Sequence, residues 1–182
     1  MKFTKDWLDI HLKSKKRESQ IIDKLNNIGL EVEKIEDKAA KLKDFKVVEV
    51  LEFRKHPDAD KLNICKIKTI DSEYELVCGA KNVKAPMKAV LAPLNSIIPV
   101  NGMKVKKVKI RGVESKGMLC SNYELGLGDD HQGIIELENN AKIGTEIAEI
   151  LNLNDPVIEI AITPNRGDCL GVYGIARDLS LI

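Results

Sequence analysis

The sequence lacks the features that mark secreted, membrane-spanning and metal-binding proteins. Its four cysteines form no C-x-x-C pair, and no histidine stands at metal-ligand spacing from them. The first residues, MKFTKDWLDIHLKSKK, contain no apolar stretch typical of a signal peptide. No apolar run approaches the length of a membrane-spanning helix. We therefore expect a cytoplasmic protein with free, mostly buried thiols and with no membrane partner.

Motifs of catalysis are missing as well. The sequence contains no Walker loop, no G-x-G-x-x-G and no H-E-x-x-H. His56 lies in a polar loop beside the carboxylates of Asp58 and Asp60. It is a candidate general base, but no nucleophile accompanies it, and the more common role of such a histidine is to bond loop backbone. We expect no catalytic residue, no metal site and no cofactor in this chain.

Charge is unevenly distributed, although the formal net charge is only +1. Residues 41–116 hold 17 Lys and Arg against 9 Asp and Glu, a balance of +8. Residues 117–149 hold 1 against 7, a balance of −6. Such asymmetry fits either ordinary solvated surface or a polyanion site. Aromatic residues make up only 4% of the chain, which argues against recognition dominated by base stacking.

The two ends of the sequence predict helices and single strands. Thr4 is placed to cap a short first helix, and the spacing of Ile21, Ile22, Leu25 and Ile28 gives one apolar helix face. Gly29 follows where a left-handed residue ends a helix. Further elements are expected as a strand over 30–36, a charged connector over 39–44, a helix over 145–151, a strand over 157–162, a turn over 163–168 and a helix over 170–181.

Between the ends, short strands alternate with turn residues. Apolar and β-branched residues predict strands over 45–53, 62–70, 74–78, 88–91, 103–110 and 133–137. Within the fifth, the apolar phase slips between Val105 and Val108, which predicts a β-bulge. Residues 56–60, with Pro and two Asp, predict a loop.

These elements predict an α+β chain, with a five-stranded OB-type β-barrel inserted into a small split α+β domain. The split domain is expected over residues 1–40 and 150–182, and the barrel over 41–149. Neither outer piece is large enough to bury a core alone. The last helix reaches Ile182 without a cap or a polar tail, so we expect a truncated part of a longer chain.

A barrel of this kind binds RNA through cations that reach phosphate. Any single lysine here can instead be solvated barrel surface. The candidate contacts in the predicted strands are Lys46, Arg54, Lys66, Lys68, Lys104, Lys106, Lys107, Lys109 and Arg111.

Four blocks of sequence resemble the tRNA-binding OB family. They are HPDADKL at 56–62, VCGAKNV at 77–83, IRGVESKGMLCS at 110–121, and ELGL at 124–127 with DDHQGI at 129–134. The resemblance implies tRNA as the partner, rather than DNA. It adds candidate contacts at motif positions, which are His56, Lys61, Asn82, Ser115, Lys116 and Ser121, while part of the motif serves turns and packing.

The flanks resemble one host of this barrel, the β subunit of bacterial phenylalanyl-tRNA synthetase. The matching segments are WL at 7–8, GLEVE at 29–33, TPNRGDCL at 163–170 and GIARDL at 174–179. This resemblance implies a parent α2β2 enzyme that joins phenylalanine to tRNA with ATP and Mg²⁺, its active site on the α subunit. The present chain is then a non-catalytic accessory region without its own cofactor. In TPNRGDCL we expect Pro164, Asn165 and Gly167 to shape a turn that Arg166 and Asp168 fix.

Three roles stay open at this point. The barrel can clamp tRNA directly, or the region can mainly support assembly of the subunits. A free-standing tRNA-binding chaperone is a separate class, against which the flanking segments argue. A secreted cytokine-like role is disfavoured by the same flanks.

Overall fold

The computed structural model describes residues 1–12, 17–130 and 132–181. They form two compact units, Met1–Ala39 with Asn152–Ile182, and Ala40–Leu151. The chain is of mixed α+β class. Among the described residues, no helix combines the length and the apolar character that crossing a membrane requires. His131, within one of the sequence blocks above, and Ile182 lie outside the described residues.

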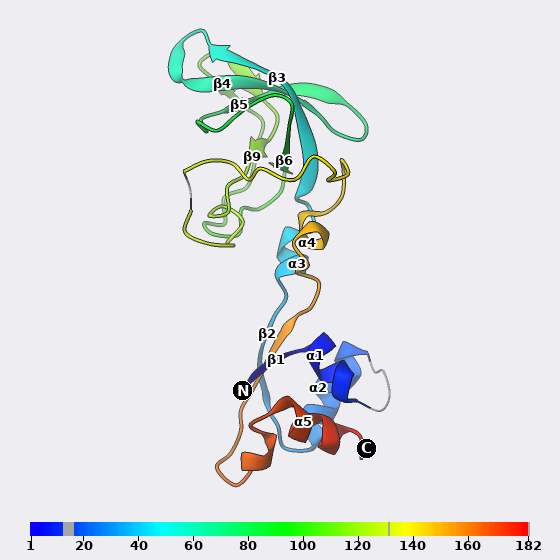
Figure 1. The fold of residues 1–182 in the computed structure, drawn as a ribbon. Coiled ribbons are helices and arrows are strands. Elements are labelled where there is room, and N and C mark those ends of the chain that lie inside the picture. The colour runs from blue at the N-terminus through cyan, green and yellow to red at the C-terminus, as the bar shows by residue number, and fades with distance from the viewer. Residues whose placement is uncertain (13–16, 131, 182) are drawn as a thin grey trace. The chain divides into compact units, whose positions relative to one another are not determined.

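The first unit is a three-stranded antiparallel sheet packed against helices (Figure 1). Its strands lie in the order β1-β10-β2, and Phe3 of β1 is opposite Ile158 of β10. Thr4 caps α1 by accepting a hydrogen bond from the backbone N–H of Trp7 at 3.3 Å, as its sequence position predicts. The elements are β1 (Lys2–Thr4), α1 (Lys5–His11), α2 (Glu18–Asn27), β2 (Val32–Glu36), β10 (Val157–Ile160), the 3-10 turn Gly167–Cys169 and α5 (Val172–Leu179).

The second unit is built on a five-stranded antiparallel sheet in the order β5-β4-β3-β6-β9 (Figure 1). The long central strand β3 pairs with β4 on one side and with β6 on the other. A separate two-stranded hairpin is formed by β7 and β8. The elements are α3 (Lys38–Leu42), β3 (Lys46–His56), β4 (Ala59–Lys68), β5 (Glu73–Cys78), β6 (Met87–Ala92), β7 (Val108–Ile110), β8 (Val113–Ser115), β9 (Met118–Leu119) and α4 (Ile147–Ile150).

Each unit has its own apolar core. In the first, Leu8, Ile21 and Leu25 pack with strand residues such as Ile158. In the second, alternate residues of the sheet strands, Val48 and Ile67 among them, point inward, as the period of two demands. All four cysteines are buried and free, which confirms the expectation from the sequence.

The predicted fifth strand over 103–110 is wrong. Only Val108–Ile110 is a strand, and it pairs with β8 rather than with the large sheet. Residues 95–98 pair instead with 103–105, through bonds such as Val105 N–H to the Ser96 carbonyl at 2.9 Å. The phase slip at Val105 and Val108 therefore marks the junction of two separate pairings and not a β-bulge.

Four other local predictions also need correction. The fifth strand of the sheet is β9, two residues long and too short to leave a periodic signal. Residues 133–137 form no strand but a single bridge between Leu137 and Lys88. The connector over 39–44 contains helix α3, because Ala39, Ala40 and the neighbouring lysines are strong helix formers. The predicted loop over 56–60 narrows to the two-residue turn Pro57–Asp58 between β3 and β4.

Candidate nucleic-acid interface

The β3–β4 turn is tied to the β7–β8 turn by two side chains. The His56 ring is 3% exposed, and its Nδ1 accepts a hydrogen bond from the Asp58 backbone N–H at 3.1 Å. Nε2 therefore carries the proton and donates to the Ile110 carbonyl oxygen at 3.1 Å. Arg111 donates from its guanidinium to the Asp58 carbonyl oxygen at 2.6 Å. The His56 side chain thus bonds backbone groups, which is the more common role named above. Through its bond to Ile110 it fixes the position of the basic residues next to Ile110 in the chain.

Three further candidates from the sequence blocks are held by intramolecular hydrogen bonds. Ser115, 2% exposed, accepts from the Val77 N–H and donates to the Gly117 carbonyl, both at 3.1 Å. Ser121 is buried and bonds the carboxylate of Glu124. The Asn82 amide makes two bonds to the backbone of Ile134, at 2.8 and 3.0 Å. These groups hold the loops of the second unit together.

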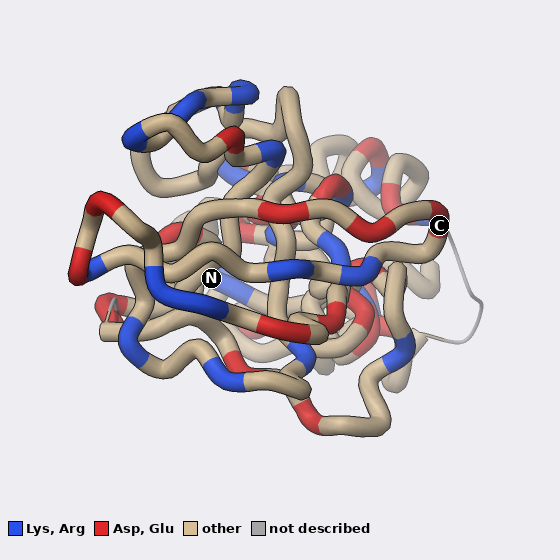
Figure 2. The backbone as a smooth tube through the Cα atoms, turned by 90° about the horizontal axis from the view of Figure 1, so that it is seen from above, with Lys and Arg blue, Asp and Glu red and all other residues tan. Residues whose placement is uncertain are grey.

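Two cations on the β3-β4-β5 part of the sheet, Arg54 and Lys66, are paired with carboxylates. Both terminal nitrogens of Arg54 donate to Glu75, at 2.5 and 2.9 Å. Lys66 pairs with Glu73 at 3.2 Å. The hydrogen bond from Arg54 holds the pKa of the Glu75 carboxyl below its ordinary value. Figure 2 shows basic and acidic residues alternating along neighbouring stretches of backbone in this manner. We call these four residues the paired face.

The basic segment, residues 104–111, differs from the paired face. Lys104, Lys106 and Lys109 are exposed, and the ion pairs between described residues include none of the three. Lys107 pairs with Glu114 at 2.8 Å, and Lys116 reaches the same carboxylate at 3.3 Å. The bond from Lys107 is the main reason that the pKa of Glu114 is lowered.

A groove of about 610 Å³ lies between the end of β5, the basic segment and the residues around β9. Its buried walls include Cys78, Val105, Leu119 and Ile134. Met103 and Val108 also line it and are about half exposed, at 48% and 46%. Most of its lining belongs to the sequence blocks at 56–62, 77–83, 110–121, 124–127 and 129–134, so the motifs indicated this end of the unit. Sequence reasoning did not predict the groove itself or the part that Met103 and Val108 play in its walls.

The groove has a positive balance of charge. Of the described residues that line it, Lys81, Lys104 and Lys106 are basic and only Glu124 is acidic. One oxygen of Glu124 already accepts hydrogen bonds from the backbone N–H and the hydroxyl of Ser121. Three ammonium groups and one internally bonded carboxylate favour an anion at the groove.

The remaining sequence candidates are exposed but lie elsewhere. Lys46 is at the start of β3, Lys61 near the start of β4 and Lys68 at its end. None of these three lines the groove. The structure therefore brings Lys104 and Lys106 together at one site, with Lys109 and Arg111 following them in the same segment, and leaves the other cations on separate strands.

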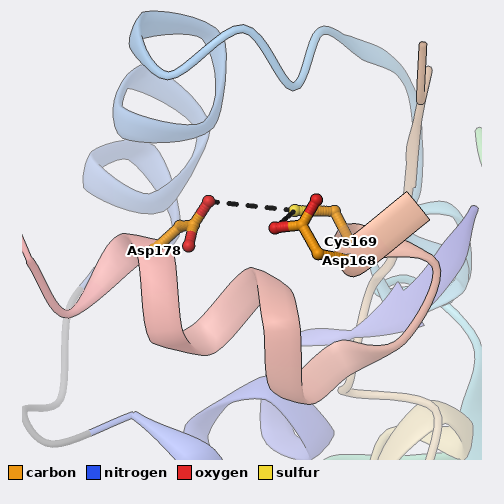
Figure 3. A group of neighbouring side chains, drawn as sticks. All are labelled: Asp168, Cys169 and Asp178. Carbon is orange, nitrogen blue, oxygen red and sulfur yellow. Dashed lines mark hydrogen bonds between the residues drawn. The ribbon is translucent and has the colours of Figure 1, made fainter. Parts of the chain in front are cut away.

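In the first unit, Asp168, Cys169 and Asp178 form a cluster of possible metal ligands (Figure 3). Arginine side chains already occupy both carboxylates, since Arg166 and Arg177 each bond Asp168 and Asp178. The pKa of Asp168 is lowered, first by the bond from Arg177 and then by that from Arg166. Arg166 also donates to the Ile28 carbonyl at 3.4 Å. The cluster is thus an ion-pair network that joins α2, the 3-10 turn and α5, and Arg166 and Asp168 fix this turn as expected.

Residues 45–146 match a protein-family model described as "Putative tRNA binding domain". The chain belongs to this tRNA-binding domain family. The match covers most of the second unit, including the paired face, the basic segment and the groove.

The whole chain is similar to longer proteins. It is 50% identical over 181 residues to the phenylalanine–tRNA ligase beta subunit of Novosphingobium aromaticivorans, which is 99% of this chain and 23% of that protein. The corresponding subunit of Rickettsia bellii is 48% identical over 180 residues, covering 99% and 21%. The chain therefore spans less than a quarter of the length of these relatives.

A likeness to solved structures is weaker. The crystal structure of a MetRS related protein from Pyrococcus horikoshii matches with a TM-score of 0.40 and 24% identity, over 56% of this chain and 86% of that one. A likeness at this level supports no statement about function.

Proposed function

We propose that residues 40–151 bind tRNA as an accessory domain of a phenylalanine–tRNA ligase beta subunit. The observation that carries this proposal is the match of residues 45–146 to the tRNA-binding domain family. It falls on the unit in which exposed lysines that form no ion pair with another described residue lie beside a groove of positive balance. Cations of this kind pair with phosphate and release counterions, which is the main source of affinity for nucleic acid.

The parent enzyme, on this proposal, attaches phenylalanine to tRNA with ATP and Mg²⁺ in the cytoplasm. It does so as an α2β2 assembly in which the α subunit carries the active site. The 50% identity along nearly the whole chain to a phenylalanine–tRNA ligase beta subunit supports this parent. The present chain contributes RNA binding or assembly contacts and performs no chemistry.

We further propose that the five-stranded sheet closes as an OB-type barrel inserted into the split domain. Two hydrogen bonds of Ser115 in β8 support this closure. One is to β5, at one edge of the sheet, and the other is to the Gly117 carbonyl beside β9, at the opposite edge. Insertion is supported by the pairing of β2 with β10, whose residues precede and follow the whole second unit.

The test is a filter-binding titration of the chain with tRNA at low and physiological salt. With three to five phosphate contacts, the affinity should fall roughly 20-fold to 500-fold between about 50 and 200 mM salt. A lack of binding even at low salt would contradict the clamp role. It would leave the second candidate, a subunit-assembly module, which the nearly neutral paired face favours. A gel-filtration assay with the α subunit tests that candidate.

A further inference from the structure

The groove has a shape and polarity that simple phosphate binding does not require. Its volume of about 610 Å³ falls in the range of about 300–1,000 Å³ that holds small organic ligands. Its walls are largely aliphatic or carry sulfur, with Val105, Leu119 and Ile134 less than 10% exposed. A phosphate group gains nothing from such walls, because burying a charge against apolar atoms is costly. The occupant must therefore carry an apolar part as well as a charge.

The rim supplies the complementary charge. Lys104 and Lys106 lie on either side of Val105, so an exposed ammonium group flanks each side of a buried apolar residue. A nucleotide with its base turned out of the stack has the matching chemistry, a flat apolar face joined to a phosphate. Unpaired bases in RNA loops are recognised in this way, whereas a duplex presents only base edges and backbone.

We propose that the groove takes one unpaired nucleotide of the bound tRNA, with the base between Met103 and Met118 and its phosphate at Lys104 and Lys106. This inference rests on the proposed tRNA-binding function and adds the part of the RNA that is recognised. Thioether side chains adapt to a flat ring and make favourable contacts with it, so they take the place of aromatic side chains, which are missing among the described residues that line the groove. Both methionines line the groove.

The four methionines of the chain provide the test. Met103 and Met118 line the groove, Met87 is 2% exposed in the core of the same unit, and Met1 belongs to the other unit. In the chain labelled with [¹³C-methyl]methionine, tRNA should shift the signals of Met103 and Met118 and leave Met87 and Met1 in place. A blunt RNA duplex should leave all four in place, even where it binds.

The possible outcomes separate this inference from the function on which it rests. If tRNA binds in the filter assay but the Met103 and Met118 signals do not move, the groove is not the nucleotide site, while the tRNA-binding function stands. Equal shifts with the duplex would likewise overturn the unpaired base. If tRNA does not bind at all, the proposed function fails and the inference fails with it.

A pair of matched variants gives an independent readout. Val108 and Val100 are similarly exposed, at 46% and 41%, but only Val108 lines the groove. Val108→Glu should weaken tRNA binding on the order of tenfold relative to Val100→Glu, because its carboxylate faces the bound phosphate. Both variants add the same charge, so equal affinities would contradict a nucleotide in the groove.

Discussion

The paired face and the basic segment differ in what their cations contact. Arg54 and Lys66 on the sheet each bond a glutamate, whereas Lys104, Lys106 and Lys109 have no such partner among the described residues. A paired cation must give up its carboxylate before it can serve a phosphate, and the freed carboxylate then repels the RNA. A lysine count along the sequence therefore overstates the cations that are available to phosphate, and we expect the pairing to decide where RNA binds.

The largest expected effect comes from removing the unpaired cations. The triple variant Lys104→Ala, Lys106→Ala and Lys109→Ala should weaken tRNA binding on the order of 30-fold and reduce the salt slope by about 2–3. Filter-binding titrations at several salt concentrations measure both quantities. The three side chains are exposed, so the free energy of unfolding should change by less than about 1 kcal/mol.

A matched variant tests the comparison itself. Arg54→Ala, Lys66→Ala and Lys84→Ala together remove the same net charge from three cations that are each paired with a glutamate. We expect roughly threefold weaker binding, the general effect of lower net charge at a distance. Equal losses for the two triple variants would mean that total charge, and not pairing, decides the affinity.

The next effect concerns the bonds that position the basic segment. In His56→Ala, the Asp58 N–H and the Ile110 carbonyl lose their partner, which should cost about 1–3 kcal/mol of stability by urea unfolding. The tRNA affinity should fall as well, because the turn that follows the basic lysines loses its anchor. His11→Ala, which alters an exposed histidine of the other unit, is the control and should change stability by less than about 0.5 kcal/mol. A stable His56→Ala protein with normal affinity would contradict the anchoring role.

The sequence predicts much of the sheet because its signal is local. Alternating apolar residues identify β3, β4, β5 and β6, since one face of each strand meets the core. The signal fails where pairing depends on distant partners. Two-residue β9 has no period, and residues 103–110 look like one strand although Val105 is 6% exposed and Val108 is 46% exposed.

The candidate site was predictable only in part, for a related reason. A lysine is visible in a sequence, but its ion pair is not, because Glu75 is 21 residues from Arg54. In the same way, the motif residues His56, Ser115 and Asn82 look like ligands until their backbone partners are seen, 38 to 54 residues away. The motifs identify the family correctly, whereas the division between binding and supporting residues needs the fold.

A smaller effect should follow from releasing the paired cations. Glu73→Gln with Glu75→Gln leaves Lys66 and Arg54 without their carboxylates. If pairing is what keeps this face from binding RNA, the double variant should bind tRNA roughly threefold more tightly, as two freed cations outside the main site would allow. Glu138→Gln with Glu149→Gln changes the charge equally at two exposed residues that belong to none of the ion pairs between described residues, and this double variant is the control. If the tRNA affinity rises equally in both double variants, the gain comes from the change in net charge and not from the release of the paired cations.

The smallest expected effect is that of pH on the difference between the two triple variants. Arg54 lowers the pKa of Glu75, and Lys107 lowers that of Glu114. A carboxyl group with a lowered pKa keeps its ion pair at all pH values above its ordinary pKa of about 4.3, and loses it only as the pH falls through the lowered value. Between pH 7.5 and pH 5 the ion pair of Arg54 with Glu75 should therefore persist. The ratio of the two variants' tRNA affinities, measured at both pH values and the same ionic strength, should change by less than about twofold.

Because both proteins contain the same histidines, protonation of these residues affects the two affinities alike and leaves the ratio unaltered. A ratio that falls toward one at pH 5 would mean that the carboxylates of the paired face are already protonated there, so that these ion pairs are too weak to keep the sheet cations from RNA.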